Sequence, residues 1–454
     1  MNSEEMMKKY LCIIFAVCFI STGFAQKKLT LNDALKIALQ KNPTLIKNSN
    51  NIITSKSNVK NAYGELLPTF SIGSGFSWRR FDNDKPQVFT DQFGQKISVF
   101  NKNKQQRTYS MRAGGSVVLF NGLANYANIA KAENDLKSAK YRINKLKQDI
   151  VLQTTTLYYN VLKAEKLFKA REENLKYNSK LLEQITEKNK LGSVAIVDVY
   201  AQEVQKGNAE LLLIQAQNNF EKAKNSLLDY LALNVLDDYE FVDINNNLIA
   251  DNYYLENYNN IRSLVSKALT RRNDFKAQQL SLESAYKSIT IAKSGLLPTL
   301  SADYSFSTSS ESNAKDLFKN RSYSAGLSLN IPIFSNWRTE NQIQIAEVRA
   351  MNSEEDLSAL ERTIKIQVKQ GFLDLSAAKK SLDVANKKVI SAKENLKINS
   401  ERYNLGAGTI IELLRADSQY IQAKSDQIDA EYEYLRLKDT LMNYLGELDY
   451  KNFE

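Results

Sequence analysis

The sequence has 454 residues, 43% hydrophobic and 25% charged, and this composition excludes a disordered chain. Its net charge is +10, and its lysines are spread along the helical segments and alternate with acids, as in "KAEKLFKAREENLK". Such mixing is typical of a solvated helix surface and argues against a nucleic-acid partner. The absence of histidine removes the commonest general base and the commonest metal ligand, so no metal site and no cofactor is expected.

The N-terminus has the pattern of a secretory signal peptide. Two lysines precede the apolar run "YLCIIFAVCFI", and "STGFAQ" offers a small-residue cleavage site after Ala25. The apolar run is too short for a membrane span. Both cysteines, Cys12 and Cys18, lie inside residues 1–25, so the mature chain would contain no thiolate metal site and no disulfide. A lipid anchor on Cys18 stays an alternative, although "FAVC" is a poor context for one.

Four segments alternate between apolar and small polar residues, which predicts strands with one apolar face. In "PTFSIGSGFSW", the large apolar side chains share one face, which Ser74 interrupts, and threonine, serines and glycines fill the other. The predicted strands cover about 68–82, 107–120, 298–310 and 321–334. The polar segment 83–106 is predicted to be a loop, and short helices over about 44–66 and 274–296 are predicted to precede the strand pairs.

The faces of these strands favour a membrane barrel over a soluble sandwich sheet, which stays the alternative. Strands of about ten residues with an apolar outer face and a small polar inner face are typical of outer-membrane barrels. Phe76, Trp78, Tyr304 and Phe306 are predicted to form an aromatic girdle in contact with lipid. Eight strands enclose an interior that side chains just fill, so a water-filled duct requires at least three chains and about twelve strands.

Two long segments read as coiled-coil helices, because no proline lies between residues 87 and 297 or after 332. The seven-residue series of a coiled-coil seam in the first segment is Ile129, Leu136, Ile143, Ile150 and Leu157. Each long helix ends at a Leu-Gly pair, where glycine supplies the left-handed cap that ends a helix. A return helix follows each pair, so the sequence predicts two long helical hairpins.

The two halves share motifs at one spacing, which predicts an internal two-fold repeat. "YSMRAGGSVVLF" begins at Tyr109 and "YSAGLSLNIPIF" at Tyr323, and these positions are 214 residues apart, as are Gly192 and Gly406. An acidic segment between the halves is predicted to be an irregular equatorial linker. The predicted domains are a signal peptide over 1–25, repeat 1 over 26–232 with a hairpin over about 122–232, the linker over 233–262, and repeat 2 over 263–454 with a hairpin over about 336–446.

These motifs together resemble the TolC-like outer-membrane efflux family over essentially the whole mature chain. The residues that carry the resemblance are "LLPTFS" and "LLPTLS", "VVLFNG" and "IPIFSN", and the tip motifs "LGSVAIVDV" and "RYNLGAGTIIELLRAD". The resemblance implies a mainly α fold with β-strands, in which a homotrimer forms a twelve-stranded outer-membrane barrel and a periplasmic α-barrel. It also implies a passive exit duct for a tripartite efflux pump or a type I secretion system.

The partners implied by the resemblance are lipid of the Gram-negative outer membrane, a periplasmic adaptor (membrane fusion) protein and, through it, an inner-membrane transporter. The adaptor is expected to contact the hairpin tips. The implied contact residues are Leu191, Gly192, Leu405, Gly406 and Gly408.

The resemblance further implies a gate at the tips. The family's acid after the first hairpin turn matches Asp198, and its tyrosine on the second hairpin matches Tyr403. The acid that narrows the pore matches Glu412, whereas a second such acid would fall at Arg415 and the family's basic link at Gly408. Arg415 is instead a candidate to pair with Glu412 or Asp198.

Structural and functional alternatives accompany this prediction. Thr409 and Glu412 fit a capping box, and Asp198 suits a helix start. The chain could also be a secreted coiled-coil scaffold or adhesin without a channel. An envelope enzyme is disfavoured, because the strand ends carry no "D-x-E" carboxylate pairs and the acids of the helices have the pattern of surface charges.

Overall fold

The computed structural model describes residues 27–81, 87–99, 104–242, 260–311 and 313–453. The predicted signal peptide and both cysteines lie outside these residues, as does much of the predicted linker. The chain divides into two compact units. Of the described residues, unit 1 contains those within 1–48, 143–273 and 361–454, and unit 2 contains those within 49–142 and 274–360.

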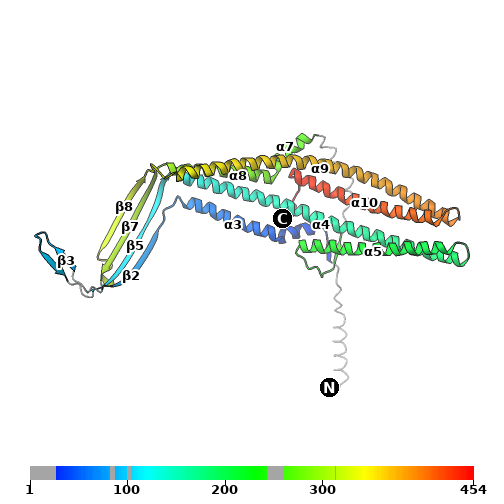
Figure 1. Ribbon diagram of the computed structural model, residues 1–454, viewed down its shortest axis with the longest axis horizontal. Coiled ribbons are helices and arrows are strands. Elements are labelled where there is room, and N and C mark those ends of the chain that lie inside the picture. Colours follow the sequence, from blue (N-terminus) through cyan, green and yellow to red (C-terminus); the bar gives the residue numbers. More distant parts are fainter. Residues whose placement is uncertain (1–26, 82–86, 100–103, 243–259, 312, 454) are drawn as a thin grey trace, which may run out of the picture. The chain divides into compact units, whose positions relative to one another are not determined.

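Unit 2 contains a four-stranded antiparallel sheet (Figure 1). Its strands, in spatial order, are β2 (Ser71–Phe81), β5 (Lys104–Asn121), β7 (Thr299–Glu311) and β8 (Arg321–Asn330). The helices that precede the two strand pairs are α3 (Pro43–Gly64) and α8 (Asn273–Lys293). The last strand was expected to reach about residue 334 but ends at Asn330, because Pro332 has no N–H with which to extend the ladder.

The apolar face of this sheet is exposed and rich in aromatic residues. The rings of Phe76 and Tyr109 lie 5.0 Å apart on paired strands, and those of Phe306 and Tyr323 lie 5.1 Å apart. Large apolar side chains that stay exposed on these strands are Ile72, Phe76, Trp78, Tyr323, Leu327 and Leu329. One face of the sheet therefore has no covering layer within the described chain.

The segment predicted as a loop over 83–106 contains a hairpin of β3 (Gln87–Thr90) and β4 (Lys96–Val99). Asp91 shapes its turn, because one carboxylate oxygen accepts the backbone N–H groups of Phe93 and Gln95 at 2.9 Å each. Gly94 adopts a φ of 82° there, which glycine tolerates. The loop prediction was therefore wrong for this part of the segment, because two short strands flank a turn that Asp91 and Gly94 shape.

Unit 1 is built on two antiparallel helical hairpins (Figure 1). The first pairs α4 (Ala124–Lys190) with α5 (Ile196–Tyr230), and the second pairs α9 (Arg338–Asn404) with α10 (Ile410–Leu445). Helices α4 and α9 belong to both units. The helices end where the Leu-Gly pairs were expected to end them, with φ values of 69° at Gly192 and 72° at Gly406.

A mixed layer of short elements packs on these helices. Strand β1 (Lys27–Leu29) pairs in parallel with β6 (Tyr239–Phe241), and the helices α2 (Leu31–Lys41) and α7 (Ile261–Arg271) accompany them. The Tyr158 hydroxyl anchors this layer, since it lies 2.9 Å from the Leu29 carbonyl oxygen and 2.8 Å from that of Val242. The linker predicted as irregular thus contributes both β6 and the start of α7.

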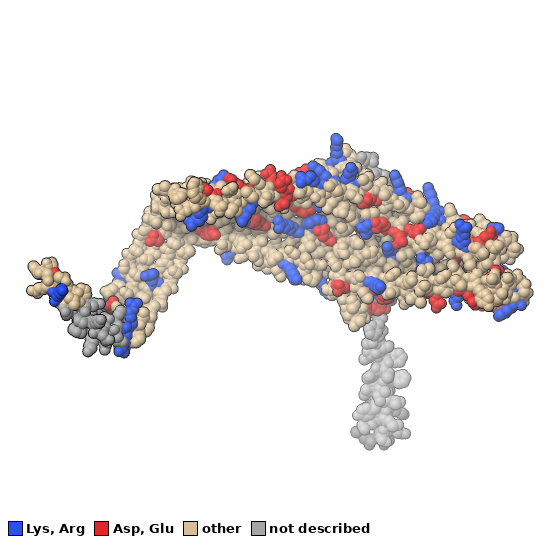
Figure 2. Space-filling model, viewed as in Figure 1, with Lys and Arg blue, Asp and Glu red and all other residues tan. Residues whose placement is uncertain are grey.

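Charges of both signs are mixed along the helices on the face drawn in Figure 2. Within unit 1, Lys163–Asp429 at 3.3 Å and Lys166–Glu431 at 3.0 Å join α4 to α10. This matches the expectation of a solvated, mixed-charge helix surface. Among the described residues, no helix combines the length and the hydropathy needed to cross a membrane.

Candidate functional site: the hairpin tips

The tips of the two hairpins are joined by a small apolar cluster. Its buried members are Leu181, Ile185, Val199, Tyr403, Ile410 and Leu413. They come from α4, α5, α9 and α10, so all four helices meet in one layer. Burial of these side chains holds the predicted gate residues of both hairpins in one place.

The structure brings Asp198 and Tyr403 together, as the family resemblance implies. Asp198 lies in the first turn of α5, and Tyr403 lies in the last turn of α9 and is 7% exposed. Burial, followed by the nearby Asp198 carboxylate, raises the pKa of Tyr403. The Tyr403 hydroxyl nevertheless meets no partner at full hydrogen-bond geometry among the described residues. The Lys188 ammonium lies over its ring, 5.3 Å from the centroid.

Glu412 caps its own helix and also meets an arginine. Its carboxylate accepts the Thr409 backbone N–H at 3.0 Å, and the Thr409 hydroxyl accepts the Glu412 N–H at 3.3 Å, which completes a capping box. Arg402 approaches the same carboxylate to 3.7 Å. The pairing suggested for Arg415 with Glu412 or Asp198 is not among the ion pairs of the described residues.

Arg415 lies in a groove between α9 and α10. The groove has a volume of about 640 Å³ and is lined mainly by Lys388, Ser391, Asn395, Arg415, Ser418, Gln419 and Gln422. Arg402 takes the place near Glu412 that Arg415 was expected to fill. The sequence contains a signal that could have identified Arg402. Arg402 is a basic residue in the last turn of α9, and Glu412 is an acid in the first turn of α10.

The hairpin turns present exposed side chains. Leu191 is 80% exposed and Leu405 is 83% exposed, although both are large and apolar. Gly408 lies beside Arg402, whose Cβ would be 3.1 Å from a Cβ added at Gly408. The turns therefore leave two leucines free for contact with another molecule.

The four predicted girdle residues lie on the sheet of unit 2, in two rows. Phe76 and Trp78 pair with Tyr109 and Arg107 on β5. Phe306 pairs with Ala113, which is four residues farther along β5, and Tyr304 is in stacked contact with Phe70. The sheet thus carries the predicted girdle residues at two register positions along β5.

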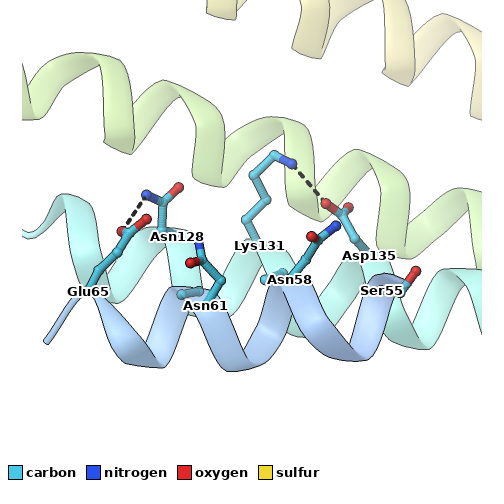
Figure 3. Close-up of a pocket in the computed structure, with 9 residues that line it drawn as sticks. Ser55, Asn58, Asn61, Glu65, Asn128, Lys131 and Asp135 are labelled. Atoms are coloured by element: carbon cyan, nitrogen blue, oxygen red, sulfur yellow. Dashed lines mark hydrogen bonds and ion pairs between the residues drawn. The ribbon is translucent and has the colours of Figure 1, made fainter. Parts of the chain in front are cut away.

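A polar groove between α3 and α4 of unit 2 is a second pocket (Figure 3). It has a volume of about 230 Å³. Its charged groups have partners within the groove: Lys131 is 2.8 Å from Asp135, and the Asn128 amide donates to Glu65 at 3.3 Å. Among the described residues, no cluster of three or more histidine, cysteine or acidic side chains could hold a metal ion.

Comparison with known proteins identifies the family to which this chain belongs. The model of the outer membrane efflux protein family matches residues 34–233 and 264–447. The chain is 23% identical to the outer membrane protein TolC of Escherichia coli (strain K12) over 464 residues, which cover 98% of this chain and 87% of that protein.

Solved structures show the same fold. The Campylobacter jejuni CmeC outer membrane channel superposes with a TM-score of 0.78 at 16% identity, covering 93% of this chain and 86% of that one. A structure of CusC superposes with a TM-score of 0.79 at 16% identity and covers 92% of each chain. The mainly α fold with β-strands and the resemblance to the TolC-like family are confirmed. The chain belongs to the outer membrane efflux protein family and is an outer-membrane efflux or export channel that extends into the periplasm of a Gram-negative cell.

Proposed function

We propose that three copies of this chain assemble into one passive duct, with four strands from each copy closing a twelve-stranded barrel. Within the described residues, β2 and β8 pair on one side only, so each copy offers two open sheet edges. Open edges are a template for pairing with another chain, and a barrel removes them. The uncovered aromatic face of the sheet suits lipid. The two open edges are the observation that carries this proposal.

A second feature of unit 1 supports assembly. An exposed apolar stripe on α5 follows a seven-residue pattern and consists of Val197, Tyr200, Val204, Leu211 and Ile214. Helix α9 exposes Ile366 and Leu373, which are seven residues apart. Stripes with this spacing are the seams of coiled coils. The helices of neighbouring copies are the partners that would cover them in a periplasmic α-barrel.

The duct acts with partners and without chemistry of its own. In a tripartite efflux pump or a type I secretion system, a periplasmic adaptor protein would dock at the tips, where Leu191 and Leu405 are exposed. An inner-membrane transporter would supply the energy through the adaptor. The chain itself would be neither an enzyme nor a cofactor-binding protein, and the domain plan would be two repeats joined by an equatorial linker.

The tip residues form the gate of this duct. Asp198 and Tyr403 meet across the two hairpins, and Arg402 joins the end of α9 to the start of α10 through Glu412. Arg415 and Gly408 shape the same region, with Arg415 lining the neighbouring groove. Opening would separate the first hairpin from the second at the tip, because the contact between Asp198 and Tyr403 crosses between them there.

The test is reconstitution of the purified mature protein. Native mass spectrometry is expected to show a trimer. On gels, unboiled samples should migrate differently from boiled samples, and planar bilayers should show single-channel conductance. A folded monomer that is soluble without detergent and carries no current would overturn the proposal and favour a secreted coiled-coil scaffold. A conducting assembly of another size would refute the count of three alone.

A further inference from the structure

A carboxylate without a cationic partner is buried between the two hairpins. Asp417, on α10, is 1% exposed. The Asn174 side-chain amide donates to both of its carboxylate oxygens at 3.2 Å, and the Asn178 amide donates to one of them at 3.0 Å. Among the described residues, no lysine or arginine forms an ion pair with it. Amide N–H groups alone therefore compensate the buried charge.

The hydrogen-bond network continues into α5. The Gln202 side-chain amide donates to the Asn178 backbone and side-chain oxygens at 2.9 Å each. One turn farther along, Gln205 donates to the Ser418 hydroxyl at 3.3 Å. Three helices, α4 and α5 of the first hairpin and α10 of the second, are thus joined through one carboxylate. These helices lie together in unit 1 in Figure 1.

The network lies close to the gate residues, on the side away from the hairpin turns. Gln202 follows Asp198 by four residues on α5, and Asp417 follows Glu412 by five residues on α10, so each lies about one turn farther from the tip. Contacts that fix α10 against α4 at this level also fix the positions of the gate side chains. A buried polar group in a helical interface is best known for this role, because it is satisfied in only one register.

Two buried polar atoms beside the network are incompletely satisfied. The Gln202 side-chain carbonyl oxygen and the Tyr177 hydroxyl meet no partner at full hydrogen-bond geometry among the described residues. Tyr177 belongs to the same turn of α4 as Asn174 and Asn178, and the Asp417 charge adds to the effect of burial in raising its pKa to about 12. A network left partly unsatisfied is less stable than a complete one. Water entering a separated tip would satisfy both atoms, which lowers the cost of opening.

We propose that Asp417, Asn174 and Asn178 form a latch that holds the first hairpin to α10 while the tip is closed, and that its hydrogen bonds break when the tip opens. The latch rests on the proposed gate function. It acts by positioning, since none of its three residues lies in the turns themselves. Its chemistry is a carboxylate held by amide donors, which differs from the Asp198–Tyr403 contact and adds another link between the hairpins near the tip.

The test is single-channel recording on the reconstituted trimer with the variants Asp417→Ala, Asn178→Ala and the double variant. Each single variant is expected to raise the time-averaged conductance about twofold or more, because the closed tip loses its contacts. The double variant should exceed the larger single effect only slightly, since both changes break the same link. Additive effects would show that the two residues act separately and would overturn the latch.

Further variants separate failure of the latch from failure of the gate. Asp417→Asn keeps the side-chain shape and tests the proposal if Asp417→Ala does not assemble. Asp439→Asn removes another carboxylate from α10, 22 residues away, and should leave conductance unchanged. If Asp198→Ala raises conductance while both Asp417 variants equal the wild type, the latch is refuted and the gate stands. If the wild-type assembly carries no current, the duct itself is refuted and the latch with it.

Discussion

The Asp439 carboxyl should make the stability of this protein depend on pH in an unusual direction. Asp439, on α10, accepts a hydrogen bond from the Tyr159 hydroxyl of α4 at 2.9 Å. Burial is the largest influence on this carboxyl and raises its pKa to about 6, against the opposing hydrogen bond from Tyr159 and the nearby charge of Lys438. Its protonation therefore occurs near pH 6 in the folded protein and near pH 4 in the unfolded chain.

The sign follows from this difference. Between pH 4 and pH 6 the folded state binds the proton and the unfolded chain releases it, so rising pH favours unfolding. The stabilisation from this group is complete below about pH 4 and is lost as the pH rises through about 6. A rise of this size in pKa is worth at most about 3 kcal/mol, since each tenfold change in proton affinity is worth about 1.4 kcal/mol.

The perturbation is Asp439→Asn, which keeps the acceptor for the Tyr159 hydroxyl and removes the titration. The assay is thermal or denaturant unfolding of the detergent-solubilised protein, followed by circular dichroism from pH 4 to pH 8. Relative to the wild type, the variant should gain stability as the pH rises, with most of the change between pH 4 and pH 7. The contributions of distant carboxylates to the pH dependence are the same in both proteins, so they cancel in the difference in stability between variant and wild type. A difference that is constant with pH, or that falls as pH rises, would refute the reasoning.

Three further predictions concern packing and gating. Tyr158→Phe should lower the free energy of unfolding by about 1–3 kcal/mol, because the Leu29 carbonyl loses a buried donor; unfolding curves measure it. Gly115→Ala should abolish the heat-modifiable trimer band on gels, because a Cβ there would overlap the Thr69 carbonyl oxygen. Asp198→Ala should raise single-channel conductance, because the gate loses the contact between the hairpins.

Each of these variants has a matched control in the chain. Tyr126→Phe changes an exposed tyrosine and should leave stability unaltered. Gly73→Ala lies in the same sheet with nothing near its Cβ position, so the trimer should form. Glu203→Ala removes an exposed acid from the same helix as Asp198 and should not change conductance. Equal effects in a variant and its control would count against the corresponding structural argument.

The elements that depend on local chemistry could be predicted from the sequence. Alternating apolar and small polar residues located the four strands of unit 2, and the absence of proline located the long helices. The ends of those helices could be placed because glycine at positions 192 and 406 adopts the left-handed conformation that few other residues tolerate. The tip motifs, read through a family resemblance, led to the proximity of Asp198 and Tyr403.

The tertiary structure decided the contacts that join distant segments. Strand β1 pairs with β6 across 212 residues. Each of these strands has only three residues, which is too short for an alternating pattern to predict a sheet. Whether Glu412 meets Arg402 or Arg415 depends on how the last turn of α9 faces the first turn of α10. Asp417 could have been one more surface acid of a polar helix. The packing of three helices around Asp417 buries its carboxylate. A buried carboxylate requires hydrogen-bond donors, and the amides of Asn174 and Asn178 supply them. Burial depends on how the helices pack and cannot be read from the residue alone.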